Sequence, residues 1–155
     1  MNLLKLNYRI VCAISVVFLS MIIMSFKYNS PAAKCNLKVV VSKIRNDNGQ
    51  VGICLFNSAD GFPYSERALE CQFTKAKTNY TEYTFTNIEM GTYAVSILHD
   101  ANDNKKLDKN WLGMPKEGIG ASNNAKGTFG PPKFNDAKFV LNKAEQTITI
   151  SLSYF

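Results

Sequence analysis

The chain has 155 residues, of which 46% are hydrophobic, and its 18 Lys and Arg against 12 Asp and Glu give a formal net charge of +6. This length suits one ordinary domain and leaves little room for a second. The lysines are scattered, with no basic run and no interleaved aromatic residues. Such a distribution is not that of a nucleic-acid-binding protein, so we expect no nucleic acid partner.

Residues 1–32 are predicted to be a leader. Lys5 and Arg9 precede an uncharged apolar run from Ile10 to Met24, and small residues stand at the third-last and last positions before the expected cleavage. This is the layout of a signal peptide. The alternative is an uncleaved membrane anchor, for which the run is short beside the roughly 20 residues that cross a bilayer. In both cases we expect an exported domain, residues 33–155, that is periplasmic, extracellular or associated with the cell envelope.

Removing the leader lowers the net charge to +3 and leaves three of the four cysteines, Cys35, Cys54 and Cys71. In an oxidising compartment two of them are expected to pair, and Cys54–Cys71 and Cys35–Cys71 both remain open. The third thiol would be buried or would pair with another molecule. The spacing of the cysteines matches no zinc motif.

The first part of the domain contains two β-branched apolar runs, Leu37–Ile44 and Val51–Phe56, on either side of the turn Asn46–Gly49. Apolar runs around such a turn predict a β-hairpin. A third strand is expected within Ala68–Thr74, after a short turn at Ser65–Leu69.

Alternating patterns continue through the middle of the domain. Tyr83 and Phe85 share one face of a strand expected at Glu82–Ile88, and a further strand is expected at Thr92–Leu98. Residues two apart in a strand lie on the same face. In the second strand that face carries Tyr93, Val95 and Ile97, and His99 would extend it.

At the end of the chain, Lys138–Leu141 and Thr147–Tyr154 are predicted to pair with each other. Ile148, Ile150 and Leu152 alternate with polar residues, and Tyr154 continues the apolar side. This alternation is typical of a half-buried antiparallel strand. About seven short strands without a substantial helix predict an all-β fold, a single antiparallel β-sandwich of the immunoglobulin or prealbumin kind.

One segment, 100–134, has no regular period. It holds five of the nine glycines and three of the five prolines. Connections longer than about 15 residues are uncommon in compact domains and are usually functional or disordered. Disorder does not fit here, because the segment also contains large apolar residues expected to anchor it: Trp111, Leu112, Met114, Ile119 and Phe129. We therefore expect one long, ordered loop.

The start of this loop resembles a calcium-binding loop of the EF-hand kind, in which oxygens at alternate positions converge on the ion. Positions 1, 3, 5, 7 and 9 would be Asp100, Asn102, Asn104, the carbonyl of Lys106, and Asp108. Position 6, which favours glycine, is Lys105, and position 12, which favours a bidentate carboxylate, is Trp111. The expected metal, calcium, would therefore bind weakly. The alternative is a loop whose Asp and Asn side chains hydrogen-bond their own backbone.

The residue order GTYAVSILHDANDNKKLDKNWLGMPKEGIGASNN at 91–124, followed by GTFGPPKFNDAKF at 127–139, resembles an uncharacterised secreted family, domain of unknown function 2141. The resemblance runs from about Leu37 to Tyr154 and includes LFNSADGFP at 55–63. The family usually has glycine where this chain has Lys105. The resemblance implies a small exported β-sandwich and no established activity.

His99 is the only histidine, so an enzymatic role would have to involve it. A small secreted hydrolase would use it with a neighbouring loop acid, Asp100 or Glu117, or with Ser122 as nucleophile. The alternative is a structural histidine that fixes the loop by hydrogen bonds to Asp100, Glu117 or Asn123. Further residues are candidates either for the site or for structuring the loop: Glu117, Ser122, Asn123 and Asn124.

Together these patterns favour a non-enzymatic exported binding module, with an unidentified ligand or envelope partner and calcium as a candidate cofactor. The hydrolase is the rival hypothesis. Membrane contact is expected only through the leader, if it is uncleaved.

Overall fold

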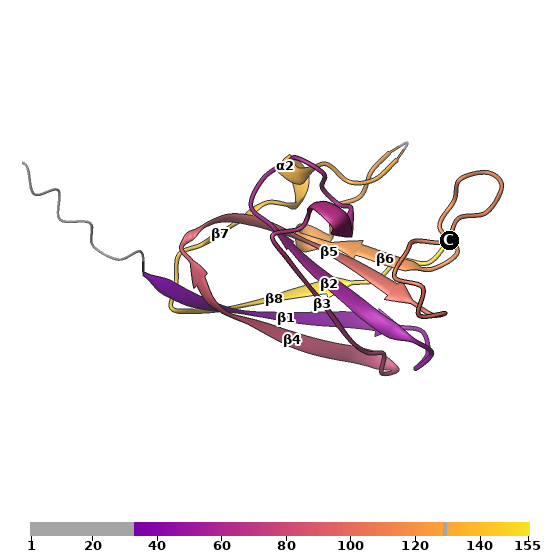
Figure 1. Cartoon of the computed structure of the whole chain (residues 1–155), viewed down its shortest axis with the longest axis horizontal. Helices are drawn as coiled ribbons and strands as arrows, with labels where there is room; N and C mark the ends of the chain where they lie inside the picture. The colour runs from indigo at the N-terminus through magenta and orange to yellow at the C-terminus, as the bar shows by residue number, and fades with distance from the viewer. Residues whose placement is uncertain (1–32, 129) are drawn as a thin grey trace, which may run out of the picture. The chain divides into compact units, whose positions relative to one another are not determined.

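Eight strands form two sheets that enclose the main hydrophobic core. The computed structural model describes residues 33–128 and 130–155 (Figure 1). The strands are β1 (Lys34–Ile44), β2 (Gln50–Phe56), β3 (Glu70–Lys75), β4 (Asn79–Glu89), β5 (Gly91–Asp100), β6 (Gly118–Ala121), β7 (Phe139–Leu141) and β8 (Glu145–Ser151). Three single-turn helices lie between them, η1 (Ser65–Arg67), η2 (Ser122–Asn124) and α2 (Phe134–Ala137). The predicted all-β sandwich is confirmed, with eight strands in place of about seven.

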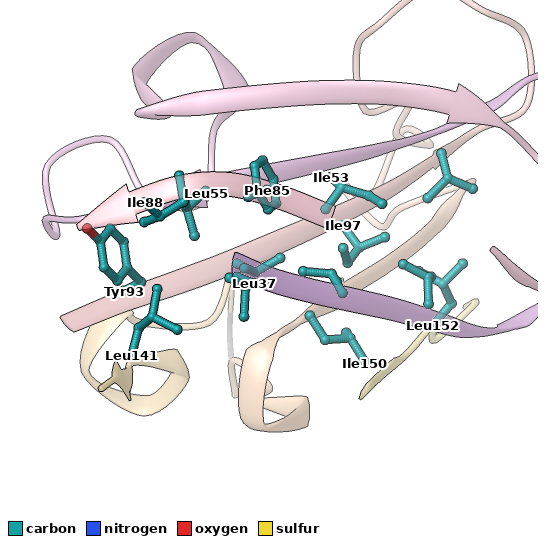
Figure 2. Close-up of a cluster of buried hydrophobic side chains, with 14 of the residues drawn as sticks. Leu37, Ile53, Leu55, Phe85, Ile88, Tyr93, Ile97, Leu141, Ile150 and Leu152 are labelled. Atoms are coloured by element: carbon teal, nitrogen blue, oxygen red, sulfur yellow. The ribbon is translucent and has the colours of Figure 1, made fainter. Parts of the chain in front are cut away.

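The smaller sheet has the order β4-β1-β8 and the larger has the order β3-β2-β5-β6, with β7 pairing the first residues of β5. Buried side chains of both sheets meet in one cluster, in which Leu37 and Phe85 come from the smaller sheet and Ile53 and Ile97 from the larger (Figure 2). The sheets also join at one corner, where Ile119 of β6 exchanges two backbone hydrogen bonds with Ser153, at 3.0 and 2.9 Å.

The alternating patterns place side chains as the sequence predicts. Tyr93, Val95 and Ile97 all belong to the core cluster, and His99 is 1% exposed on the same face of β5. Ile150 and Leu152 are buried, and Ile148 and Tyr154 pack against the same cluster. Because apolar residues repeat at every second position in β5 and β8, each of these strands turns one face toward the core.

The predicted hairpin of β1 with β2 is wrong, because these strands lie in different sheets. β1 pairs β4 in antiparallel and β8 in parallel orientation, whereas β2 lies between β3 and β5. All residues from Val51 to Phe56 are buried, so β2 is covered on both faces. A second, small cluster of Ala94, Ala121 and Ala137, with Phe62 and Phe134 against it, lies on the side of β5 away from the main core. The turn at 46–49 reverses the chain direction but leads into the other sheet.

The predicted pairing of Lys138–Leu141 with Thr147–Tyr154 is also wrong. β7 pairs β5, and β8 runs parallel to β1, with Val39 opposite Ile148 and Val41 opposite Ile150. Alternation specifies which face of a strand is buried, but it does not specify the neighbouring strand. The half-buried character of β8 is therefore as predicted, whereas its antiparallel orientation is not.

The segment 100–134 contains more regular structure than its sequence suggests. β6 has the sequence GIGA and pairs the end of β5, with His99 opposite Gly118. A Cβ atom on Gly118 would lie 2.5 Å from the ring of Tyr154, and one on Gly120 would lie 3.0 Å from the Ile150 side chain. Close packing therefore requires glycine at both positions. Because glycine has no side chain, β6 lacks the alternating apolar pattern from which a strand is predicted.

Cys54 and Cys71 stand opposite each other on β2 and β3 and form a disulfide, while Cys35 is free and buried in the core. One of the two pairings left open by the sequence is thus the one adopted. The leftover thiol lies inside the protein.

Candidate functional site

The long connection 101–117 between β5 and β6 carries half of the ten candidate residues, and His99 and Asp100 lie just before it. Figure 1 shows this connection extending beyond the ends of the strands. Its two ends are fixed by β5 and β6, whose pairing brings Gly118 opposite His99.

His99 is a buried residue that joins three segments of the chain. Its Nδ1 lies 2.7 Å from the hydroxyl of Tyr154, and its Nε2 lies 3.0 Å from the carbonyl oxygen of Asn48. A carbonyl oxygen only accepts hydrogen bonds, so Nε2 is the donor to Asn48. In the neutral ring, Nδ1 then accepts a hydrogen bond from the Tyr154 hydroxyl. That hydroxyl also accepts a hydrogen bond from the backbone N–H of Arg45, at 3.1 Å, and the Arg45 guanidinium lies 4.1 Å from the ring centre.

The predicted hydrogen bonds of His99 to Asp100, Glu117 or Asn123 are wrong. Asp100 follows His99 directly, so its side chain points to the other face of β5. Tyr154 is the partner that sequence reasoning missed. Its position two residues after Leu152, on the buried side of the last strand, was the available signal, but alternation alone does not place it beside β5.

Ser122 is positioned by backbone groups and has no contact with His99. Its hydroxyl is 1% exposed, accepts from the N–H of Val95 at 2.9 Å and donates to the carbonyl of Ala137 at 2.6 Å. Ser122 and His99 therefore do not form a nucleophile–base pair.

Asn123 and Asn124 likewise hold the chain after β6 in place. The Asn123 amide donates to the carbonyls of Asp136 and Lys138, at 3.2 and 2.9 Å, and Asn124 Oδ1 accepts from the N–H of Ser151 at 2.9 Å. Both have left-handed backbone conformations, with φ of 58° and 50°. Asn tolerates this region better than most residues, which accounts for its use here.

Asp100 is the residue on which the first turn of the loop closes. Its carboxylate is completely buried and accepts from the backbone N–H of Asn104 at 3.1 Å and of Lys105 at 2.8 Å. The side-chain amide of Gln50 lies 3.4 Å from the same group. A short acidic side chain that accepts amides four and five residues later forces the backbone to curl.

Glu117 ties the two ends of this turn together. Its side chain is 7% exposed, with Oε1 accepting from the N–H of Ala101 and Oε2 from that of Asp108, each at 3.0 Å. Glu117 is therefore loop-structuring, as one of the two sequence-based alternatives proposed. It acts through the backbone of the loop, not through His99.

The remaining candidate calcium ligands hydrogen-bond within the loop. Asp108 accepts the side-chain amides of Asn102 and Asn104 at 2.7 and 3.3 Å, and Asn104 Oδ1 accepts the N–H of Lys106 at 2.7 Å. The structure thus has the Asx-turn arrangement that was the alternative to calcium. In the described part of the chain, no group of three or more His, Cys, Asp and Glu residues is arranged to hold a metal ion.

Lys105 stands at position 6 of the expected calcium loop, where glycine is favoured, and its backbone has the conformation that suits glycine. Its φ is 59°, in the left-handed region, so the turn keeps this conformation even though the side chain is a lysine. The ammonium group lies 5.4 Å from the centre of the Phe73 ring. The chain therefore forms this turn without glycine, the residue that adopts the left-handed conformation most easily.

The apolar residues expected to anchor the loop do not all do so. Trp111 is 90% exposed, Leu112 is 64% and Met114 is 43%, whereas Ile119 is half-buried in β6 and Phe129 lies outside the described residues. Hydrogen bonds, and not the burial of apolar side chains, order this part of the loop. Asn110 Oδ1 accepts from the N–H groups of Leu112 and Met114, at 2.9 and 3.0 Å.

Comparison with known proteins places the chain in a family. A family model described as "uncharacterized protein conserved in bacteria", domain of unknown function 2141 (DUF2141), matches residues 39–149. The chain belongs to this family. No curated protein and no solved structure matches the DUF2141 chain. The match includes His99 and the whole connection 101–117, while Tyr154, the partner of His99, lies beyond its end.

We predict that Glu117→Gln destabilises the DUF2141 chain by about 1–3 kcal/mol, because one backbone N–H would lose its acceptor. Urea unfolding would measure the loss, and hydrogen exchange at Ala101 and Asp108 should become faster. Glu145→Gln, on the exposed start of β8, is the matched control and should change neither. Equal stability of the two variants would contradict the role of Glu117.

We also predict a loss of stability at alkaline pH. Burial raises the pKa of Tyr154 above 10.0, although the backbone N–H and the charge of Arg45 lower it, and burial with the charge of Glu89 raises the pKa of Tyr93. The folded state then holds these protons more tightly than the unfolded state. The corresponding stability is present below pH 10.0 and is lost as the pH rises through the folded-state pKa values.

Urea unfolding between about pH 8 and pH 11 would measure this decline. Tyr154→Phe should make it shallower, and Tyr80→Phe, whose ring is 59% exposed, should not. The same slope in the wild type and in Tyr154→Phe would show that Tyr154 is not responsible.

Proposed function

We propose that this DUF2141 chain is an exported, non-enzymatic β-sandwich that uses the connection 101–117 to bind a ligand or partner in the cell envelope. The observation that carries the proposal is the rigid, exposed end of this connection. Trp111 is 90% exposed on a turn that Asn110 fixes with two side-chain hydrogen bonds. A binding surface that is already ordered loses less conformational entropy when it engages a partner.

Export is supported by the leader pattern of residues 1–32, which lie outside the described residues, and by the Cys54–Cys71 disulfide. Disulfides persist mainly in oxidising compartments. Within the described ranges, no helix is long and apolar enough to cross a membrane.

A binding role is supported further by the burial and hydrogen bonding of His99 and Ser122, two side chains considered for the hydrolase. Both ring nitrogens of His99 and the hydroxyl of Ser122 are buried and engaged in hydrogen bonds. A general base must reach a proton on the substrate, and the His99 ring is 1% exposed. These contacts suit a structural role.

Calcium remains part of the proposal as a weak stabiliser of residues 100–108. Each carboxylate oxygen has two lone pairs, so Asp100 could accept its backbone N–H groups and still face a cation. A cation would replace the amide N–H groups of Asn102 and Asn104 beside Asp108, with those amides turned to present oxygen. With two carboxylates and the Lys105 ammonium nearby, the expected affinity is in the millimolar range of extracellular calcium modules.

Export is tested by producing the full chain in a bacterial host, fractionating the cells and sequencing the N-terminus of the recovered protein. We expect the protein in the envelope or medium, beginning at Ala33. An intact N-terminus in the membrane fraction would instead identify an anchor, which still leaves the domain exported. Recovery of the full chain in the cytoplasm alone would contradict the proposal.

Calcium binding is tested by thermal unfolding of residues 33–155 in millimolar calcium and in EDTA. Binding to the folded state alone must raise the midpoint. Asp108→Asn should abolish the increase, Asp103→Asn, an exposed acid outside the ligand set, should preserve it, and magnesium should not reproduce it. An unchanged midpoint, with unshifted resonances of Asp100 and Asn104, would rule calcium out.

A further inference from the structure

The most distinctive surface of the described residues is the end of the β5–β6 connection, residues 109–116, here called the tip. Its sequence is KNWLGMPK, with a lysine at each end and no acid between them. Three of the nine large hydrophobic residues exposed in the described ranges lie here within four positions: Trp111, Leu112 and Met114.

Backbone hydrogen bonds within the tip fix a conformation that leaves these side chains exposed to solvent. Lys109 and Pro115 form an isolated antiparallel bridge, the N–H of Asn110 donates to the carbonyl of Met114 at 2.9 Å, and the N–H of Gly113 donates to the carbonyl of Asn110 at 2.9 Å. Gly113 supplies the left-handed conformation, with φ of 79°. A loop whose only role was to connect β5 with β6 would gain nothing from ordering three apolar side chains outside the core.

The tip itself carries positive charge and no acid, while the turn before it carries acids of its own, of which Asp103 is exposed and Asp108 half-buried. Lys109 and Lys116 are exposed at its base, and Lys105 and Lys106 are exposed on the preceding turn. The three ion pairs found among the described residues, Lys34–Glu89, Lys38–Glu82 and Arg67–Asp60, include none of them. The nearby carboxylates of Asp100 and Glu117 are buried against backbone N–H groups.

We propose that the tip inserts into the surface of a lipid bilayer that carries anionic phospholipid headgroups. Tryptophan favours the boundary between headgroups and acyl chains, and lysines at the same level attract anionic lipids. Leu112 and Met114 add apolar area to the inserted surface. The inference rests on the proposed function only in placing the domain outside the cytoplasm, and it names the envelope partner.

A protein partner fits the tip less well. Stable protein interfaces bury at least about 1,200 Å² in total, and a convex tip of eight residues supplies only a small part of that area. A bilayer needs no complementary groove and accepts a few side chains. The sequence suggested membrane contact only through the leader; the tip provides a second, independent contact.

The test uses residues 33–155, which form one compact unit containing both hydrophobic clusters. Trp111 is the only tryptophan of the chain, so its fluorescence reports on the tip alone. Vesicles of phosphatidylglycerol and phosphatidylcholine in equal parts should shift its emission to shorter wavelength, and brominated acyl chains should quench it. Pure phosphatidylcholine vesicles should have a much smaller effect.

Variants assign the binding to the tip, with sedimentation of vesicles as the measurement. Trp111→Ser should lower vesicle binding by about tenfold or more. The double variant Lys109→Gln/Lys116→Gln should lower it by about fivefold for each lysine. The matched control Lys126→Gln/Lys143→Gln, at exposed positions away from the tip, should bind as the wild type does, and Val140→Ser controls for an exposed apolar residue on β7.

Unchanged emission with anionic vesicles, or equal binding of the two double-lysine variants, would overturn the inference. If the protein reaches the envelope but binds no vesicles, the lipid inference fails and the proposed export stands. If the protein stays in the cytoplasm, the proposed function fails whatever the vesicles show. Circular dichroism should give the same folded spectrum for every variant, because the substituted side chains are exposed.

Discussion

The β5–β6 connection depends on two buried carboxylates, Asp100 and Glu117. Between them they accept four backbone N–H groups, those of Ala101, Asn104, Lys105 and Asp108. A buried N–H without an acceptor is costly, and a carboxylate accepts several such groups at once. In the described residues, no buried side-chain nitrogen or oxygen lacks a partner. Hydrogen bonds from its own backbone N–H groups to these two carboxylates therefore order the loop. Its apolar side chains remain exposed at the surface.

Hydrogen bonds between polar groups also stabilise the end of the core. His99 belongs to β5 in the larger sheet and Tyr154 follows β8 of the smaller sheet, and their hydrogen bond links these two parts of the chain beside the apolar cluster. Arg45 and Asn48, from the turn between β1 and β2, complete the network. A polar network with every partner supplied fixes one arrangement more strictly than apolar packing, which tolerates several. The single histidine thus has a structural role, because its ring links β5 to Tyr154 and to Asn48.

The sequence predicted what depends on local pattern. The buried face of β5, the face of β8, the odd cysteine and the Asx-rich turn follow from spacing or composition. It could not predict what depends on distant contacts: β1 pairs β8 in place of β2, and β6 is a strand because Gly118 leaves room for the Tyr154 ring. The exposure of Trp111 was missed for the same reason, since an amide of Asn110 holds the turn that burial was expected to hold. Of the candidate site residues, Glu117 accepts hydrogen bonds from the loop backbone, whereas His99 has hydrogen-bond partners other than those expected.

The parallel pairing of β1 with β8 links the first strand of the domain to the last. β1 is the central strand of its sheet, and its neighbours begin at Asn79 and at Glu145. The smaller sheet therefore cannot close until nearly the whole chain is available. Contacts between such distant segments slow folding, because a long loop must close before any of them forms. Ser151, the last residue of β8, must therefore be synthesised before the chain can complete this sheet.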